Sequence, residues 1–325
     1  MRAAVITGYG RPPEFLDRAD PAAAAGWTTV AVTAAPIVPL DLLCASGTSY
    51  FGPPQLPYVP GVQGVGLVTQ SDRFAPGTKV FFSSQAGMAA GDGSLAQICS
   101  VPDTDVIPIE QQLPDAAVAS IGLSGVAAWM ALSWRAGLQP GETVIVLGAS
   151  GAVGQAAIGA ARALGAGHIV AVCRSAAAEQ RAAKTNPDAI LRLSSAPDEL
   201  ALADDLRAAC GGSADVVLDP VFGGAATAAI RVLAPGGRLV NLGGSLSDTA
   251  VLSSAALRGK SLSVLGYTNN ALRPEQRASA LAAVLREAAA GRLSVEHTVL
   301  PLSDCAAAWQ QAISGGPRVV LDPHR

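Results

Sequence analysis

The chain has 325 residues, of which half are hydrophobic and 14% are charged, and its formal net charge is −3. This length exceeds what one typical core holds, so two domains are expected. The composition is globular, and the lack of a basic run argues against nucleic acid and anionic membrane surfaces as partners. No apolar stretch approaches the ~20 residues of a membrane span. Residues 1–7 enter a strand-like run without a signal-peptide layout, so a cytoplasmic location is expected.

The five cysteines are scattered and never form a C-x-x-C pair, and none of the three histidines lies beside a cysteine pair. Disulfides and a structural zinc are therefore not expected.

The first third of the chain predicts short antiparallel strands in a small barrel or sandwich. Turn signals such as Gly52-Pro53-Pro54 and Pro76-Gly77 separate the runs. The expected strands are residues 3–7, 28–33, 64–69, 79–83 and 95–100.

From Pro114 to Gly266, helical and strand runs alternate, which predicts a doubly wound parallel sheet. Several of the strand runs are continuously apolar, as expected for strands that are covered on both faces. The expected strands are residues 144–147, 168–173, 189–193, 215–219, 238–242 and 262–266. Helices are expected from Gln155 to Leu164 and from Gly224 to Leu233.

The segment 143–154 reads as a buried strand, a glycine-rich turn and the start of a helix. Such a unit directs backbone N–H groups and a helix N-terminus at one point, which suits a dinucleotide pyrophosphate. Ala149 stands where the dinucleotide fingerprint has its first Gly, and a tight strand-to-helix turn without a ligand is the alternative. The residues assigned to the cofactor here are Ala149, Ser150, Gly151, Ala152 and Val153.

Two further strand ends are assigned to the same cofactor. The second strand ends in Cys173-Arg174-Ser175, with no carboxylate to hold a ribose 2′-hydroxyl, and Arg174 can pair with a 2′-phosphate, so NADPH is predicted. An exposed structural arginine is the alternative for Arg174. Gly243 and Gly244 follow a strand at the carboxyl edge of the sheet and are assigned to the nicotinamide half.

After Tyr267 the alternation stops. A helix is expected from Pro274 to Gly291, a second one over residues 304–313 with Ser303 as its cap, and a terminal strand over 318–321. The expected domains are residues 1–116 with 267–325, and residues 117–266 as the nucleotide-binding insert.

This order resembles the medium-chain dehydrogenase/reductase superfamily, in particular its zinc-free quinone oxidoreductase (ζ-crystallin-like) branch. The resemblance covers nearly the whole chain, in family order, through the segments 34–41, 56–66, 76–80, 125–132, 138–142, 219–224 and 233–238. It implies an α/β fold in which a Rossmann sheet is inserted into a β-rich, GroES-like, partly open barrel domain. It also implies a homodimer, joined through the open edge at residues 262–265.

The departures from the zinc alcohol dehydrogenases of this superfamily are informative. Where those enzymes carry Cys and a His-Glu pair, this chain has Val38, Val62 and Gln63, and residues 121–125 contain no cysteine. Valine offers no zinc ligand, so no metal is expected. Quinone reductases commonly have Asn at the position of Val38 and Thr at that of Ala127, so either other polar groups orient the nicotinamide here or its orientation is looser.

The resemblance also suggests residues for the chemistry. Tyr50 lies in a loop that faces the cleft in relatives and is either a hydrogen-bond donor to the substrate oxygen or a packing residue. The segment 266–270 lines either the substrate cleft or a dimer contact, and Asn269 is assigned to the cofactor. Arg318 replaces a family Lys and is assigned to the cofactor, with a solvated terminal charge as the alternative.

The leading functional hypothesis is an NADPH-dependent, metal-independent reductase of quinones or α,β-unsaturated carbonyl compounds. Two alternatives stay open: an oxidoreductase for an unusual carbonyl in one biosynthetic route, and a nucleotide-binding protein that has lost turnover and has a structural or regulatory role.

Overall fold

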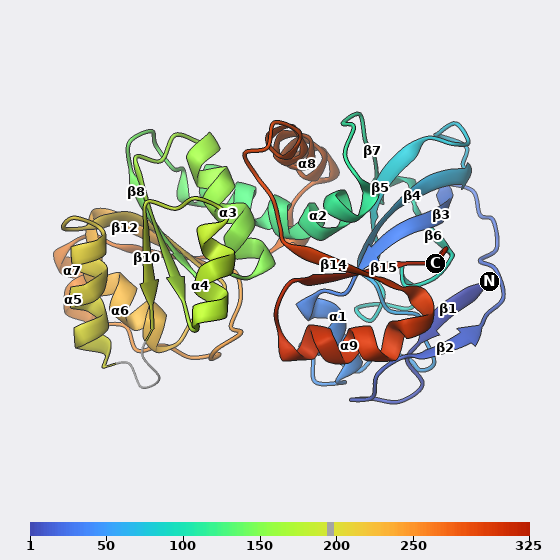
Figure 1. Ribbon diagram of the computed structural model, residues 1–325, viewed down its shortest axis with the longest axis horizontal. Helices are drawn as coiled ribbons and strands as arrows, with labels where there is room; N and C mark the ends of the chain where they lie inside the picture. Colours follow the sequence, from blue (N-terminus) through green and yellow to red (C-terminus); the bar gives the residue numbers. More distant parts are fainter. Residues whose placement is uncertain (194–197) are drawn as a thin grey trace. The chain divides into compact units, whose positions relative to one another are not determined.

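The computed structural model describes residues 1–193 and 198–325, and the chain folds into two compact units (Figure 1). The first unit comprises Met1–Gly122 and Val295–Arg325, and the second comprises Leu123–Ser294.

The first unit contains a mostly antiparallel sheet with the strand order β14-β15-β3-β4-β5-β7, and β6 pairs with β3. The strands are β3 (Trp27–Pro36), β4 (Gln63–Gln70), β5 (Lys79–Ser83), β6 (Ile98–Pro102), β7 (Val106–Pro108), β14 (His297–Pro301) and β15 (Arg318–Asp322). A separate hairpin joins β1 (Arg2–Val5) to β2 (Glu14–Asp17). The helices are α1 (Pro39–Ala45) and α9 (Cys305–Ser314), with short 3₁₀ turns η1 (Asp103–Asp105) and η4 (Leu302–Asp304).

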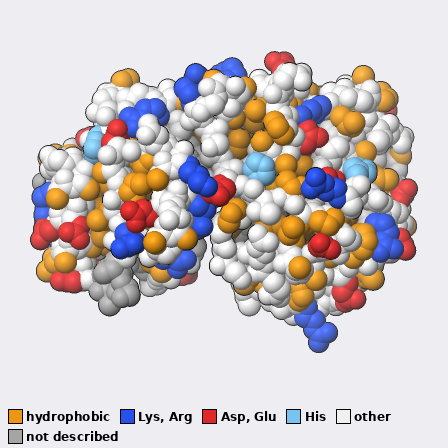
Figure 2. Space-filling view, viewed as in Figure 1, with side chains coloured by type: hydrophobic (Ala, Val, Ile, Leu, Met, Phe, Trp, Pro, Cys, Tyr) orange, Lys and Arg blue, Asp and Glu red, His pale blue; other side chains and the backbone are white. Residues whose placement is uncertain are grey.

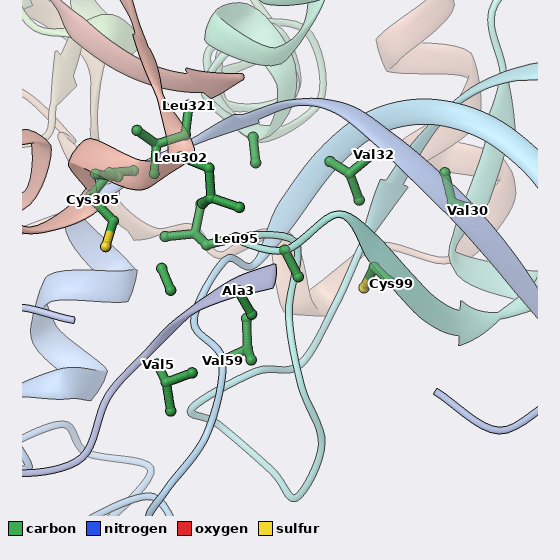
Figure 3. Close-up of a cluster of buried hydrophobic side chains, with 14 of the residues drawn as sticks. Ala3, Val5, Val30, Val32, Val59, Leu95, Cys99, Leu302, Cys305 and Leu321 are labelled. Carbon is green, nitrogen blue, oxygen red and sulfur yellow. The ribbon is translucent and has the colours of Figure 1, made fainter. Parts of the chain in front are cut away.

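The core of the first unit gathers side chains from both ends of the chain (Figure 3). Successive side chains of a strand face opposite ways, so Val30 and Val32 of β3 enter the same cluster. Leu302 and Leu321 enter it from the C-terminal part of this unit, Val295–Arg325. Burial of these side chains, at about 25 cal/mol per Å² of apolar surface, ties the C-terminal segment to the N-terminal strands.

The second unit is a doubly wound sheet. Its strands are parallel and follow the order β10-β9-β8-β11-β12-β13. They are β8 (Thr143–Leu147), β9 (His168–Cys173), β10 (Ala189–Arg192), β11 (Ala214–Asp219), β12 (Leu233–Asn241) and β13 (Ser263–Gly266). The helices are α3 (Ala152–Ala163), α4 (Ala176–Ala183), α5 (Glu199–Ala209), α6 (Gly224–Val232), α7 (Ser254–Gly259) and α8 (Pro274–Ala289), with the 3₁₀ turn η3 (Asn269–Ala271). Helix α2 (Asp115–Met130) begins in the first unit and runs on into the π-helix η2 (Ala131–Ala136).

The predicted α/β class is confirmed, with a parallel sheet and a separate β-rich sheet, and β13 lies at an edge of the parallel sheet as expected. Two details differ. The helix α9 follows a 3₁₀ turn and its N-cap is Asp304, without a side-chain hydrogen bond, so Ser303 is not the cap. Residues 267–294 belong to the second unit because α8 packs on α3, whereas the sequence-based boundary assigned them to the first domain.

Among the described residues, one helical stretch, Asp115–Ala136, is long and apolar enough to cross a membrane, which corrects the expectation that no apolar stretch approaches that length. In this structure 72% of its most apolar window is buried inside the protein, which is the pattern of a core helix. On the face drawn in Figure 2, acidic and basic side chains are interspersed with hydrophobic ones rather than gathered by sign.

Candidate active site

The turn between β8 and α3 has the geometry of a phosphate-binding loop. Gly148 adopts φ = 62°, and Gly151 donates its N–H to the Gly148 carbonyl at 3.0 Å. Gly151 is the N-cap of α3, and no side chain caps this end of the helix. The turn is anchored by Ala149 N–H, which donates to the Val172 carbonyl at 3.0 Å. The uncapped N–H groups and the helix dipole are therefore held in place for an anion.

Glycine is required at Gly154 because α3 lies directly on the turn. A Cβ there would overlap the Gly148 carbonyl oxygen and lie 2.5 Å from Ala149 Cα. A Cβ at Gly151 would meet only the Gly148 oxygen, at 3.4 Å, and Gly151 is exposed. The two glycines thus have different roles: Gly154 allows helix–turn packing, and Gly151 leaves the approach to the turn open. These residues fit a dinucleotide pyrophosphate, and buried Ala149 would contribute only its backbone.

The carboxyl end of β9 presents Arg174, which is exposed. Ser175 follows it and caps α4, since its hydroxyl accepts the Ala178 N–H at 3.2 Å. A carboxylate, missed by sequence reasoning, also lies near this strand end: Glu179 is 3.6 Å from Arg192 Nη1, and Arg192 is in register with Cys173. No direct signal marks this carboxylate in the sequence, because Glu179 lies in the first turn of α4 rather than at the end of the strand.

A buried network organises the ends of β11 and β12. Asp219 is fully buried and accepts the N–H groups of Val221 at 3.0 Å and Phe222 at 2.7 Å. Burial raises the pKa of this carboxyl, and these two hydrogen bonds oppose the rise. The Asn241 amide donates to Asp219 Oδ2 at 3.3 Å and to the Gly243 carbonyl at 2.8 Å. The hydrogen bonds of Asn241 and Asp219, at the ends of β12 and β11, therefore hold the segment that begins at Gly243 in place.

Asn269 lies in η3, just beyond the end of β13. Its amide donates to the Leu123 carbonyl at 3.1 Å and accepts the Tyr267 hydroxyl at 2.7 Å. Both ends of this side chain are thus engaged by protein groups.

In the first unit, Tyr50 is 79% exposed, and its ring packs on Phe51 with centroids 4.3 Å apart. Arg318 is half-buried rather than solvated: its Nη1 donates to the Ile37 carbonyl at 2.9 Å, and burial lowers its pKa to about 10 while Asp41 opposes that change.

Asp41 joins the segments that contain Val38 and Val62. The carboxylate is 1% exposed and accepts the N–H groups of Val38 at 2.8 Å, Gly61 at 3.1 Å and Val62 at 3.0 Å. Burial raises its pKa to about 6 against the effect of these hydrogen bonds and of Arg318. Sequence reasoning did not single out this residue, although an acidic residue three positions after a helix N-cap can accept the N-cap N–H, as Asp41 does from Val38.

The side-chain amide of Gln63 lies next to Val62, in one of these two segments. It is fully buried, its Nε2 donates to the Ala119 carbonyl at 3.2 Å, and a Cβ at Gly122 would overlap its Oε1. Within residues 1–193 and 198–325, no three side chains of His, Cys, Asp or Glu converge as a metal-binding group would. Val38, Val62 and Gln63 do not fit a tetrahedral zinc site.

Comparison with known proteins agrees with this architecture. Residues 24–111 match the family "Alcohol dehydrogenase GroES-like domain", and residues 152–287 match "Zinc-binding dehydrogenase". The zinc in the second description is not supported by the residues at the ligand positions described above.

Two curated relatives match the chain over different lengths. The chain is 30% identical over 292 residues, 88% of its length, to a phenolphthiocerol/phthiocerol polyketide synthase protein of Mycobacterium tuberculosis, and the match spans 13% of that protein. It is 33% identical over 172 residues to human quinone oxidoreductase, which is 51% of this chain and 50% of the human protein. The matched region thus spans half or less of each relative.

Solved structures resemble the whole chain. A probable oxidoreductase from Mycobacterium abscessus superposes with a TM-score of 0.86 at 26% identity, covering 99% of each chain. The quinone oxidoreductase from Thermus thermophilus, whose complex with NADPH is also known, superposes with a TM-score of 0.79 at 27% identity, covering 99% of this chain and all of that one.

Proposed function

The chain belongs to the medium-chain dehydrogenase/reductase superfamily and is quinone oxidoreductase-like, and on this basis we propose that it reduces a quinone or an activated, α,β-unsaturated carbonyl double bond with NADPH and without a metal. The observation that carries the proposal is the β8–α3 turn, where an uncapped helix N-terminus and an open Gly151 fit a dinucleotide pyrophosphate. The NADPH complex of the Thermus thermophilus enzyme supports the choice of cofactor.

In this proposal, residues of the second unit bind the cofactor and orient it. The backbone of residues 149–153 holds the pyrophosphate, and Arg174 pairs with the ribose 2′-phosphate. No carboxylate directly follows β9, so none is placed there to repel this phosphate. Gly243 and Gly244, fixed through Asn241, offer backbone groups to the nicotinamide half. Bound NADPH supplies the hydride.

Substrate activation relies on hydrogen bonding. When hydride adds to an electron-poor carbon, negative charge develops on the substrate oxygen, and a positioned donor stabilises it. Tyr50 is assigned this role because the residue is 79% exposed and therefore accessible to a ligand. Val38, Val62 and Gln63 offer no zinc ligand, so no Lewis acid takes part in the proposed reaction.

We also propose a homodimer formed through β13. This strand lies at an edge of the parallel sheet, and Val264 on it is 39% exposed. An unpaired edge with an exposed apolar side chain favours pairing with a second copy about a two-fold axis.

The match to a polyketide synthase protein over 88% of the chain favours a second candidate, an oxidoreductase dedicated to one carbonyl substrate in a biosynthetic route. A panel of simple quinones, enones and enoyl thioesters, assayed by the oxidation of NADPH with and without a chelator, separates the candidates. Turnover of simple quinones or enones that survives the chelator supports the leading proposal. Turnover restricted to one acceptor of the panel supports the second, and NADPH binding without any turnover refutes both.

A further inference from the structure

Helix α2 is broken where the second unit begins. Gly122 has φ = 27° and ψ = −128°, which no helical residue adopts, and Leu123 is the first residue of the second unit. The helical stretch from Leu123 to Met130 therefore needs its direction set from outside the helix. Asn269 Nδ2 provides such a contact, since it donates to the Leu123 carbonyl at 3.1 Å across 146 positions of sequence.

The orientation of the Asn269 amide is determined by Tyr267. The Tyr267 hydroxyl donates to Asn269 Oδ1 at 2.7 Å, so the oxygen faces the phenol and the nitrogen faces Leu123. Burial raises the pKa of Tyr267, so its hydroxyl stays protonated and remains a donor. A flipped amide would set its carbonyl oxygen against the Leu123 carbonyl oxygen.

The same contacts reach the end of β12. Tyr267 donates its backbone N–H to the Asn241 carbonyl at 2.9 Å, and the Asn241 side chain donates to the Gly243 carbonyl at 2.8 Å. A continuous path of hydrogen bonds and short chain segments thus links Leu123, Asn269, Tyr267, Asn241 and Gly243.

Sheet order assigns this path to one half of a bound dinucleotide. With the pyrophosphate at the end of β8, the adenosine half extends toward β9 and Arg174, and the nicotinamide half extends toward β11 and β12. Asn269 follows β13, next to β12, on the nicotinamide side.

We propose that Asn269 is a positioning residue: its carboxamide couples the first turn of the Leu123–Met130 helix to the Gly243 segment and so sets the nicotinamide half of the site, without acting on the adenosine half. This inference rests on the proposed NADPH-dependent function. It gives Asn269 an indirect role beside the direct cofactor contact expected from sequence, since its amide oxygen and nitrogen each make a hydrogen bond to a protein group.

The test compares two probes on the same variants. Isothermal titration measures the Kd of 2′,5′-ADP, which reports only the adenosine half, and of intact NADPH, whose nicotinamide fluorescence is recorded in parallel. In Asn269→Ala and Tyr267→Phe, we expect the Kd of 2′,5′-ADP to stay within about twofold, while that of NADPH rises about five- to tenfold, as for the loss of one hydrogen bond. The NADPH emission should move toward that of the free cofactor.

Two further variants sharpen the comparison. Asn269→Asp keeps the acceptor for Tyr267 but turns an oxygen toward the Leu123 carbonyl, so its effect on NADPH should equal or exceed that of the alanine variant. Glu275→Gln changes an exposed residue of the following helix α8 and should bind both probes as the wild type does.

Equal weakening of both probes would show that Asn269 supports only the general fold and would overturn the inference. If the wild type binds both probes and Asn269→Ala shows the same NADPH affinity and emission as the wild type, the inference is overturned while the proposed function stands. A wild type that binds neither probe would overturn the proposed function, and this inference with it.

Discussion

Replacing Asp41 by Asn should reverse the relative stability of variant and wild type between pH 4 and pH 7. The carboxyl is 1% exposed, and burial raises its pKa from 3.8 to about 6. A raised folded-state pKa means that the fold favours the protonated form. The stability contributed by protonation is fully present below pH 3.8 and is lost as the pH rises through about 6. The difference of about 2 pKa units corresponds to roughly 3 kcal/mol of unfolding free energy at about 1.36 kcal/mol per unit.

The asparagine of the variant does not titrate, so this loss is absent from it. The amide oxygen still accepts the Gly61 and Val62 N–H groups, but the amide nitrogen meets the Val38 N–H, and this mismatch should cost about 1–3 kcal/mol at every pH. Asp41→Asn should therefore be less stable than wild type at pH 4 and equally or more stable at pH 7.

Urea unfolding followed by circular dichroism at pH 4, 5, 6 and 7 measures both curves. Groups that are common to both proteins cancel in the difference, and Asp72→Asn, at an exposed position, controls for the loss of one carboxylate. A wild-type-minus-variant difference that stays constant over this range would refute the reasoning, because it would show that the Asp41 carboxyl has the same pKa in the folded and unfolded chains.

Three further predictions concern the site. Gly154→Ala should lower the Tm and weaken NADPH binding, because its Cβ meets backbone atoms of the turn. Gly151→Ala should keep the Tm and lower only the affinity for NADPH, and calorimetry of the Tm together with titration of the cofactor separates the two effects. Arg174→Ala should raise the KM for NADPH far more than that for NADH, and equal effects on the two would remove Arg174 from the 2′-phosphate site. Tyr50→Phe should lower kcat roughly 10- to 1,000-fold with an enone or quinone, and an unchanged kcat would shift the donor role to backbone N–H groups.

The parallel sheet is readable from the sequence because strands covered on both faces are continuous apolar runs. The predicted strands 144–147 and 168–173 stand out for this reason and match β8 and β9 closely. Strands without this signal escape prediction: β2 is four residues with little burial, and β7 is three residues. Their existence depends on pairing with β1 and β5, which sequence periodicity does not encode.

The parts of the candidate site that lie in one continuous stretch of sequence are predictable. The contacts between residues far apart along the chain are not. The turn at residues 148–154 is one continuous motif with its own glycine requirements, so the sequence reveals it. The partners of Asn269 and Arg318 lie 146 and 281 positions away along the chain. Such contacts depend on the packed fold, so the sequence does not reveal these protein partners, and the cofactor role expected for both residues stays a prediction.

The Asp41 carboxylate holds the backbone around Val38 and Val62 independently of the side chains at those positions. The carboxylate holds the backbone N–H groups of Val38 and Val62, two positions where zinc-dependent relatives carry ligands. These contacts involve only main-chain donors, so they are compatible with any side chain at either position. The absence of metal chemistry that we propose is therefore compatible with an unchanged backbone at these two positions. In the proposed metal-free reaction, the rate comes from binding, orientation and hydrogen bonding to the developing oxyanion. On that proposal, the contacts that set the nicotinamide half carry more weight than in an enzyme that polarises its substrate with zinc.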